Sequence, residues 1–216
     1  MRILLTAGAT REPIDAVRFL SNTSTGATGA ALADAWAQAG HTVVLLHGLG
    51  AVTPIAPVER EPFSSAADLA ERLARRLGAE AFDLVVMAAA VADYRPAAIS
   101  EGKLPSLADE LTLRLVRNPK LLPQLKSFAT SAVRVIGFKL TAGADPQAQR
   151  AAVAAQFAAG GVDAVVHNDQ TDVRFAGSAQ QTFQIFSSAE AAPQIVVSAA
   201  ALAAALAPPA TAAFHP

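Results

Sequence analysis

The chain has 216 residues, of which 52% are hydrophobic, and its 17 Lys and Arg stand against 18 Asp and Glu. That apolar content excludes a wholly disordered chain, and the net charge of −1 argues against a nucleic-acid-binding surface. The absence of cysteine excludes a disulfide framework, a thiolate nucleophile and cysteine-based metal sites. Since no signal peptide opens the chain and no apolar run reaches 18 residues, we expect a soluble, cytoplasmic protein without membrane contact.

Strand-like and helix-like segments alternate along the chain. In chain order we expect a strand at 2–6, a helix at 28–40, a strand at 41–47, a helix at 66–77, a strand at 82–88, a short helix at 121–128, a strand at 133–139, a helix at 146–159, strands at 163–167 and 181–187, and a helix at 191–206. Unbroken apolar runs such as 41–47 are typical of strands buried on both faces of a parallel sheet. The alternation predicts one α/β domain over 1–206 with a doubly wound, mostly parallel, Rossmann-like sheet.

Three segments depart from this alternation. The stretch 48–62 is expected to be a loop. The stretch 94–117 is polar and irregular, but Leu111, Leu113 and Leu115 alternate with polar residues, which predicts an inserted β arm or flap. The Pro- and Ala-rich tail at 207–216 predicts disorder.

Polar residues follow directly after four of the apolar strands, in the stretches 6–29, 88–96, 137–141 and 167–175. Ligands of open α/β sheets bind outside the carboxyl ends of the strands, so these loops predict the ligand site. The first turn lacks the G-x-G-x-x-G pattern, because Gly8 is followed only by Gly26 and Gly29. The second strand ends in His47 and Gly48, with no acid for a ribose, so an ordinary dehydrogenase is disfavoured.

Two of these loops carry candidate binding chemistry. The hydroxyl-rich stretch SNTSTGATG at 21–29 leads into a predicted helix N-terminus, which favours a phosphate; the alternative is an ordinary helix cap. In AAAVADYRP at 88–96, three alanines let a ligand approach the backbone closely, and Asp93 and Arg95 suit a metal or a polar group. The alternative there is a surface ion pair of little energetic weight.

Seven motifs occur in the order found in one known family. They are TAGATREPID at 6–15, VRFLSN at 17–22, the turn at 24–29, the loop at 88–96, RNP at 117–119, GFK at 137–139 and HND at 167–169. Together they resemble phosphopantothenate–cysteine ligase (phosphopantothenoylcysteine synthetase) over essentially the whole chain except the tail. In many bacteria this domain is fused behind a flavin-dependent decarboxylase, and the chain resembles the stand-alone form.

The resemblance implies a ligase of coenzyme A biosynthesis. It joins 4′-phosphopantothenate and L-cysteine through an acyl-nucleotide intermediate, with CTP (or ATP) as co-substrate and Mg²⁺. Such a reaction needs fixed donors for developing charge and no side-chain nucleophile, which agrees with the absence of cysteine and of any Ser–His–Asp spacing. The resemblance also implies a homodimer paired through the arm, and a functional link to a separate phosphopantothenoylcysteine decarboxylase.

Individual residues acquire roles from the same resemblance. Asn22 matches the residue that holds the acyl-nucleotide, and Lys103 matches the flap lysine of the second half-reaction, so these two are the expected catalytic residues. Asp93 is also the expected Mg²⁺ ligand. Nucleotide- and substrate-binding residues are expected at Arg18, Ser24, Gly26, Ala89, Ala90, Asp93, Asn118, Pro119, Phe138, Lys139, Asn168 and Asp169.

The chain departs from the family pattern at several lysines. The flap has one lysine, Lys103, instead of Lys-x-Lys-Lys, and Ala27, Gln156 and Gly160 stand where the family usually carries lysine. This loss of positive charge leaves open a second hypothesis, a homologue that binds nucleotide or a pantothenate derivative without turnover. An NADP-dependent short-chain-type reductase is disfavoured, because the single tyrosine, Tyr94, is not followed by a lysine four residues later.

Overall fold

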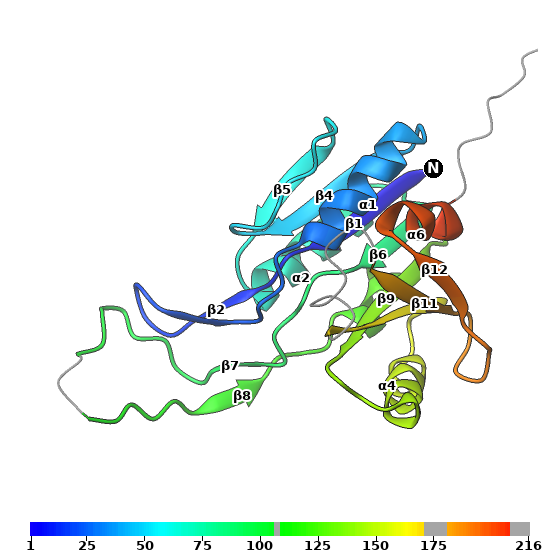
Figure 1. Ribbon diagram of the computed structural model, residues 1–216. Coiled ribbons are helices and arrows are strands. Elements are labelled where there is room, and N and C mark those ends of the chain that lie inside the picture. Colours follow the sequence, from blue (N-terminus) through cyan, green and yellow to red (C-terminus); the bar gives the residue numbers. More distant parts are fainter. Residues whose placement is uncertain (106–108, 171–180, 208–216) are drawn as a thin grey trace, which may run out of the picture.

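The computed structural model describes residues 1–105, 109–170 and 181–207, which fold around one eight-stranded sheet (Figure 1). Six strands are parallel: β1 (Arg2–Ala7), β4 (Thr42–Gly48), β5 (Glu59–Phe63), β6 (Leu84–Met87), β9 (Arg134–Thr141) and β10 (Ala164–Asp169). Strands β11 (Thr182–Phe186) and β12 (Gln194–Val197) extend the sheet beyond β10 in antiparallel pairing. The order β12-β11-β10-β9-β6-β1-β4-β5 gives the parallel strands the doubly wound arrangement, which confirms the predicted fold class.

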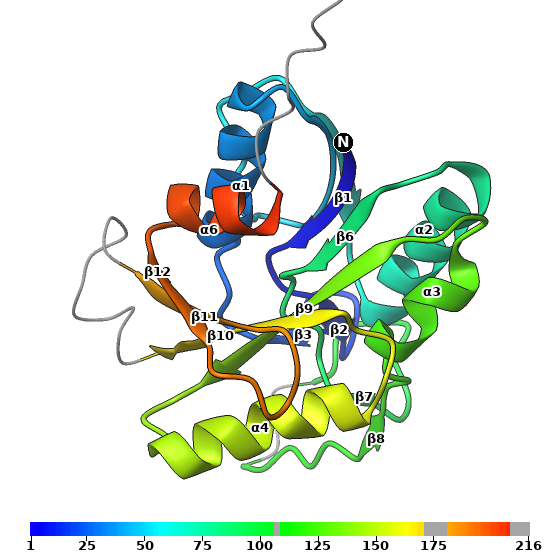
Figure 2. The same cartoon turned by 90° about the vertical axis from the view of Figure 1, so that its right-hand side faces the viewer.

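Helices cover both faces of the sheet (Figure 2). Helices α1 (Ala27–Gln38) and α6 (Ala199–Leu206) lie on one face, where Trp36 is fully buried and its Nε1 donates to Ala203 O at 2.9 Å. Helix α2 (Ala66–Ala79) lies on the other face with α3 (Leu125–Phe128), which follows the 3-10 turn η1 (Leu122–Gln124). Helix α4 (Pro146–Ala158) packs Val153 against β10 on that same face. Apolar side chains thus fill the space between the sheet and both helix layers.

Two segments differ from the sequence-based expectation. The last part of the loop expected at 48–62 belongs to the edge strand β5 (Glu59–Phe63), whose polar sequence EREPF carries no apolar run. The carboxylate of Glu61 is nonetheless buried beneath the guanidinium groups of Arg72, Arg75 and Arg76. Residues 191–198, expected to be helical, instead contain strand β12, because Pro193 interrupts a helix and Ile195, Val196 and Val197 favour a strand.

A hairpin and an arm project from the sheet on the same side (Figure 1). The hairpin, strands β2 (Arg11–Pro13) and β3 (Phe19–Ser21), was not expected from the sequence. The arm begins with β7 (Tyr94–Pro96), which pairs antiparallel with β8 (Leu115–Arg117). Of the three leucines whose alternation predicts the arm, Leu111, Leu113 and Leu115, only Leu115 lies in a strand.

The C-terminal boundary lies slightly beyond the expected one. Ala207 is buried and its N–H donates to Ala203 O at 2.9 Å, so it continues the packing of α6. The remainder of the predicted tail, 208–216, lies outside the described residues. Within the part of the chain that the structure describes, no helix has both the length and the apolar character needed to cross a membrane.

Candidate active site at the carboxyl edge of the sheet

Strands β1 and β6 lie side by side at the point where the strand order reverses, and three glycines meet beside the end of β1. Gly8 and Gly26 both have positive φ, and a Cβ on Gly26 would lie 3.0 Å from the backbone N of Gly8. Gly29 brings α1 onto β1, since a Cβ there would lie 2.4 Å from Ala7 Cβ. The first turn lacks the G-x-G-x-x-G sequence, but Gly8, Gly26 and Gly29 lie together in space. The residues between Gly8 and Gly26 form a hairpin.

The loops after β1 and β6 are joined by hydrogen bonds. Ala90 N donates to Gly8 O at 2.8 Å, and Thr10 N donates to Ala90 O at 3.2 Å. The buried hydroxyls of Thr6 and Thr10 accept from Ala89 N at 3.1 Å and Ala92 N at 3.0 Å. The sequence reasoning missed both threonines, although a polar residue inside or directly after an apolar strand was the available signal. These bonds make the two loops into one fixed platform.

Asn22 lies on this platform. It follows β3 directly, its side chain is exposed, and its Nδ2 lies 3.4 Å from Ala90 O, a long hydrogen bond. The structure therefore brings together Asn22, Ala89 and Ala90, which the sequence analysis had grouped.

The N-terminus of α1 begins at the same place. Gly26 is its N-cap and provides no side-chain cap, and Ala27 N lies 3.4 Å from Thr25 Oγ1, a long contact. Ser24 is exposed just before it. The first N–H groups of α1 are thus not satisfied by a close side-chain cap, which suits an anion rather than the ordinary capping alternative.

The base of the arm adds the next group of predicted residues. Asn118 Nδ2 donates to Ala92 O at 2.9 Å and its backbone N donates to Asp93 O at 2.9 Å, so Asn118 is tied to the loop after β6 and carries the exposed Pro119. Asp93 pairs with Lys120, with 2.5 Å between Oδ1 and Nζ. Arg95 donates to Asn118 Oδ1 at 3.0 Å, so the expected alternative of an Asp93–Arg95 pair is not formed.

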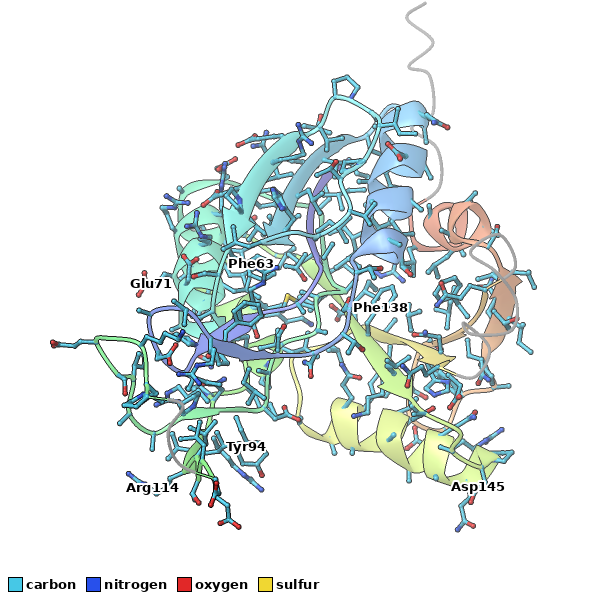
Figure 3. The ribbon with its side chains drawn as sticks, turned by 60° about the vertical axis from the view of Figure 1, so that its left-hand side comes forward. Phe63, Glu71, Tyr94, Arg114, Phe138 and Asp145 are labelled. Carbon is cyan, nitrogen blue, oxygen red and sulfur yellow. The ribbon has the colours of Figure 1, made fainter. Side chains whose placement is uncertain are left out.

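Phe138 and Lys139 extend β9 past the neighbouring strand. Met87, the last residue of β6, is in register with Gly137, so the two residues that follow lie beside the platform, both half-buried. Figure 3 shows Phe138 near the centre of the molecule, whereas Tyr94 and Arg114 lie out on the arm. Gln156 of α4 packs over this strand, with its Nε2 3.4 Å from Phe138 O.

Asn168 and Asp169 end β10, the strand next to β9. Asp169 is buried, and its carboxylate accepts from Thr141 Oγ1 at 2.6 Å and Gly143 N at 2.9 Å. These bonds fix the loop after β9. The carboxylate of Asp169 therefore accepts hydrogen bonds from within the protein. Asn168 is half-buried beside it, and residues 171–175 of the fourth predicted loop lie outside the described residues.

Arg18 and Lys103 lie apart from the platform, at the hairpin tip and on the arm. Arg18 forms an ion pair with the buried Asp15, with 2.6 Å between Nη2 and Oδ2, and the same Nη2 donates to Leu104 O at 2.7 Å. The pKa of Asp15 lies well below its usual range. The hydrogen bond from the Leu104 N–H lowers it most, and the Val17 N–H and Arg18 lower it further, although burial acts in the opposite direction. Lys103 is exposed next to Leu104. Asp15 is the main residue that the sequence analysis overlooked.

A metal held by the protein alone does not fit this site. Among residues 1–105, 109–170 and 181–207, no three His, Cys, Asp or Glu side chains gather as a metal site. A Mg²⁺ ion at Asp93 would take its remaining ligands from nucleotide phosphates and water, as is usual for this ion. Two open hollows of the surface, beside Asp163 and beside His41, lie at the amino ends of the strands, away from the platform.

The chain matches a known protein family and curated proteins of coenzyme A biosynthesis. Residues 1–208 match the family model described as DNA/pantothenate metabolism flavoprotein C-terminal domain. The coenzyme A biosynthesis bifunctional protein CoaBC of Vibrio parahaemolyticus is 41% identical over 140 residues, which cover 63% of this chain and 34% of that protein. The chain thus spans about a third of the length of the curated relatives it matches.

Solved structures share the fold. The DNA/pantothenate metabolism flavoprotein from Streptococcus pneumoniae matches with a TM-score of 0.83 at 22% identity, over 95% of this chain and 96% of that chain. A Cab2 mutant in complex with phosphopantothenate-cysteine matches with a TM-score of 0.72 at 19% identity, over 91% of this chain and 79% of that chain. The family model matches nearly the whole chain, which confirms the resemblance predicted from the motifs: the chain belongs to the family of the DNA/pantothenate metabolism flavoprotein C-terminal domain.

Proposed function

We propose that the chain joins 4′-phosphopantothenate to L-cysteine through an acyl-nucleotide intermediate, with CTP as the activating nucleotide. One observation carries the proposal: Asn22 contacts Ala90 on the platform, beside the N-terminus of α1, which has no close side-chain cap. Family membership supports it, because the CoaBC relatives are named as coenzyme A biosynthesis proteins.

Each part of the platform has a task in this reaction. The first N–H groups of α1 bind phosphate oxygens, and Ser24 adds a hydroxyl donor beside them. Asn22 donates to an oxygen of the acyl-nucleotide without adding charge. Ala89 and Ala90 are small, so the intermediate lies against the backbone.

The neighbouring segments complete the proposed site. Asn118, Pro119, Phe138, Lys139 and Asn168 line the side on which the nucleotide lies, and Arg18 and Asp169 hold the loops around it. Lys103 neutralises the charge that develops while the cysteine amine attacks. Asp93 is the proposed protein ligand of Mg²⁺, which supplies charge neutralisation on the phosphates when bound.

A second candidate function rests on the distribution of positive charge. Ala27, Gln156 and Gly160 replace expected lysines, and three cations near the site already have protein partners, namely Arg18, Arg95 and Lys120. A protein that binds the nucleotide or a pantothenate derivative without turnover fits this loss of charge.

We also propose a homodimer. The arm exposes Leu111, Leu113 and Leu115, and the hairpin beside it exposes Val17, Phe19 and Leu20. A ribbon of this kind is only marginally stable in water, and burial against a second copy would stabilise it. The product would then pass to a separate phosphopantothenoylcysteine decarboxylase.

One assay tests the function. The protein is incubated with 4′-phosphopantothenate, cysteine and Mg²⁺ and with each of CTP, ATP, GTP and UTP, while pyrophosphate release and the coupled product are measured. We expect both pyrophosphate release and formation of the coupled product, with the highest rate when CTP is the nucleotide. Faster turnover with ATP would replace CTP as the nucleotide, and nucleotide binding without pyrophosphate release would favour the non-catalytic homologue.

A further inference from the structure

A buried carboxylate divides its hydrogen bonds between the hairpin tip and the arm. The side chain of Asp15 has no exposed surface. Its Oδ1 accepts from Val17 N at 2.9 Å and Arg18 N at 2.8 Å, both within the tip. Its Oδ2 accepts from Arg18 Nε at 2.9 Å and from Leu104 N, in the arm, at 3.0 Å. One oxygen therefore shapes the tip and the other holds the arm.

The arm is held through the backbone N–H and C=O groups of Leu104. While Leu104 N donates to Asp15, Leu104 O accepts from Arg18 Nη2 at 2.7 Å. Ser100 N donates to Ile14 O at 3.1 Å, which joins the same two segments four residues earlier. Lys103 lies between these attachment points and directly precedes Leu104, so its backbone is held from both sides.

The hairpin itself is anchored to the body of the protein. The carboxylate of Glu12 is buried and accepts from Ala66 N at 2.9 Å, at the start of α2, and Arg11 N donates to Ser64 O at 2.8 Å. Ser21 Oγ donates to Thr10 O at 2.8 Å, immediately before Asn22. One anchored element thus carries Asn22 at its end and holds the Lys103 segment at its tip.

We propose that Asp15 is a positioning residue, which holds the arm at Leu104 and thereby fixes the backbone of Lys103 for the cysteine-dependent half-reaction. This inference rests on the proposed function, which assigns that half-reaction to Lys103. Asp15 acts through Leu104 and contacts no reacting atom. The ionised form of Asp15 is needed, because Oδ2 accepts from two N–H donors and a proton on that oxygen would occupy one of these positions.

The substitution Asp15→Asn tests the inference selectively. The asparagine Oδ1 can keep the bonds within the tip, while its Nδ2 faces the donors Arg18 Nε–H and Leu104 N–H and cannot accept from them. We expect at least threefold faster amide hydrogen exchange in a peptide covering 98–105, with exchange in 19–25 unchanged. The matched control is Asp163→Asn, because Asp163 also accepts from a cation, Lys126, and from a backbone N–H, that of Val135, at the far end of the sheet.

The half-reactions provide the second measurement. In Asp15→Asn, pyrophosphate release from CTP and 4′-phosphopantothenate should stay within about threefold of the wild type, while cysteine incorporation falls about tenfold. In a Lys103→Gln background the same change should have no further effect on cysteine incorporation, because both substitutions remove one function. Additive losses, or equal loss of both half-reactions, would overturn the positioning role.

A variant on the arm side guards against a folding defect in Asp15→Asn. Leu104→Pro removes the N–H that donates to Asp15 and keeps the carbonyl that accepts from Arg18, and it should reproduce the faster exchange and the selective loss of cysteine incorporation. Unchanged exchange in both variants of an active enzyme would overturn the inference and leave the proposed function standing. A wild type that releases no pyrophosphate would overturn the proposed function and with it the catalytic consequence, while the exchange data would still decide whether Asp15 holds the arm.

Discussion

The platform and the arm are both parts of the proposed site, but they are held in different ways. The platform is built from backbone bonds between the loops after β1 and β6, with buried threonine hydroxyls and close glycine contacts beneath it. The arm has a short ladder at its base and its attachment at Leu104, and its leucines face outward. The platform is therefore held by bonds within the chain, whereas the arm leaves the apolar side chains of Leu111, Leu113 and Leu115 exposed.

The largest effect is expected where the platform meets the ligand. Asn22→Asp should reduce product formation at least a hundredfold, about 2.7 kcal/mol or more, because a carboxylate repels the negatively charged intermediate. The melting temperature should stay unchanged, since Asn22 is exposed. The same amide-to-carboxylate change at the exposed Gln194 is the control, and near-normal turnover of the Asn22 variant would remove this residue from the site.

The arm is tested by charging its apolar side. Leu113→Asp should weaken the homodimer by at least about 2 kcal/mol, roughly thirtyfold in Kd, because it places an unpaired carboxylate in the interface. Sedimentation should show monomer, and activity should fall. Ile55→Asp is the matched control, because Ile55 is 96% exposed on a loop away from the arm. A wild type that is monomeric and fully active at micromolar concentration would contradict the proposed dimer.

One substitution placed in each region compares their packing directly. Gly29→Ala should destabilise the fold by about 1–3 kcal/mol, because the added Cβ would meet Ala7 Cβ at 2.4 Å. In thermal unfolding, the melting temperature should fall by roughly 2–4 °C for each kcal/mol of lost stability. Gly102→Ala on the arm has no atom within 4 Å of the new Cβ, so its melting temperature should hardly move. Equal losses in the two variants would contradict the comparison.

Lys103→Gln tests the division of the reaction between the two regions. Pyrophosphate release should persist, while cysteine incorporation should slow about tenfold, about 1.4 kcal/mol, because the arm acts after activation. Lys126→Gln is the control, since Lys126 pairs with Asp163 at the opposite end of the sheet. If both half-reactions slow equally, Lys103 does not separate them.

The smallest effect concerns pH. Because the folded-state pKa of Asp15 is lowered, its stabilising contribution is present above the unfolded pKa, near 4, and is lost as the pH falls through the folded pKa. The difference in unfolding free energy between wild type and Asp15→Asn should therefore be constant from pH 5 to 8 and shrink below about pH 4. Urea denaturation at a series of pH values measures it, and a change between pH 6 and 8 would implicate another group.

The parallel sheet could be predicted because its signal is local. In β4, the run Val43–Leu46 is apolar and buried at every position, which is the pattern of a strand covered on both faces. The proposed site rests on the same strands, since their carboxyl ends carry the polar loops. Asn22 and Ala90 could be grouped only through the family resemblance, because their contact joins residues far apart in the sequence.

Other features depend on contacts that the local sequence does not encode. Strands β2 and β3 have three residues each and are stabilised by bonds to distant segments, such as that from Ala66 N to Glu12. The glycine set was hidden because the hairpin separates Gly8 from Gly26. The helix expected at 191–206 forms only over the Ala-rich segment Ala199–Leu206, because residues Gln194–Val197 pair with β11 as a strand.

The two edges of the sheet have opposite consequences for self-association. At β5, Glu59 and Arg60 place exposed charges of opposite sign on the edge strand, and a strand from another molecule would have to desolvate them. At β12, Ile195 and Val197 are 64% and 53% exposed, and among the residues that the structure describes no strand pairs with the outer side of β12. Edge-to-edge aggregation should therefore begin at β12, and a lysine in place of Ile195 is the substitution that would protect concentrated solutions of this protein.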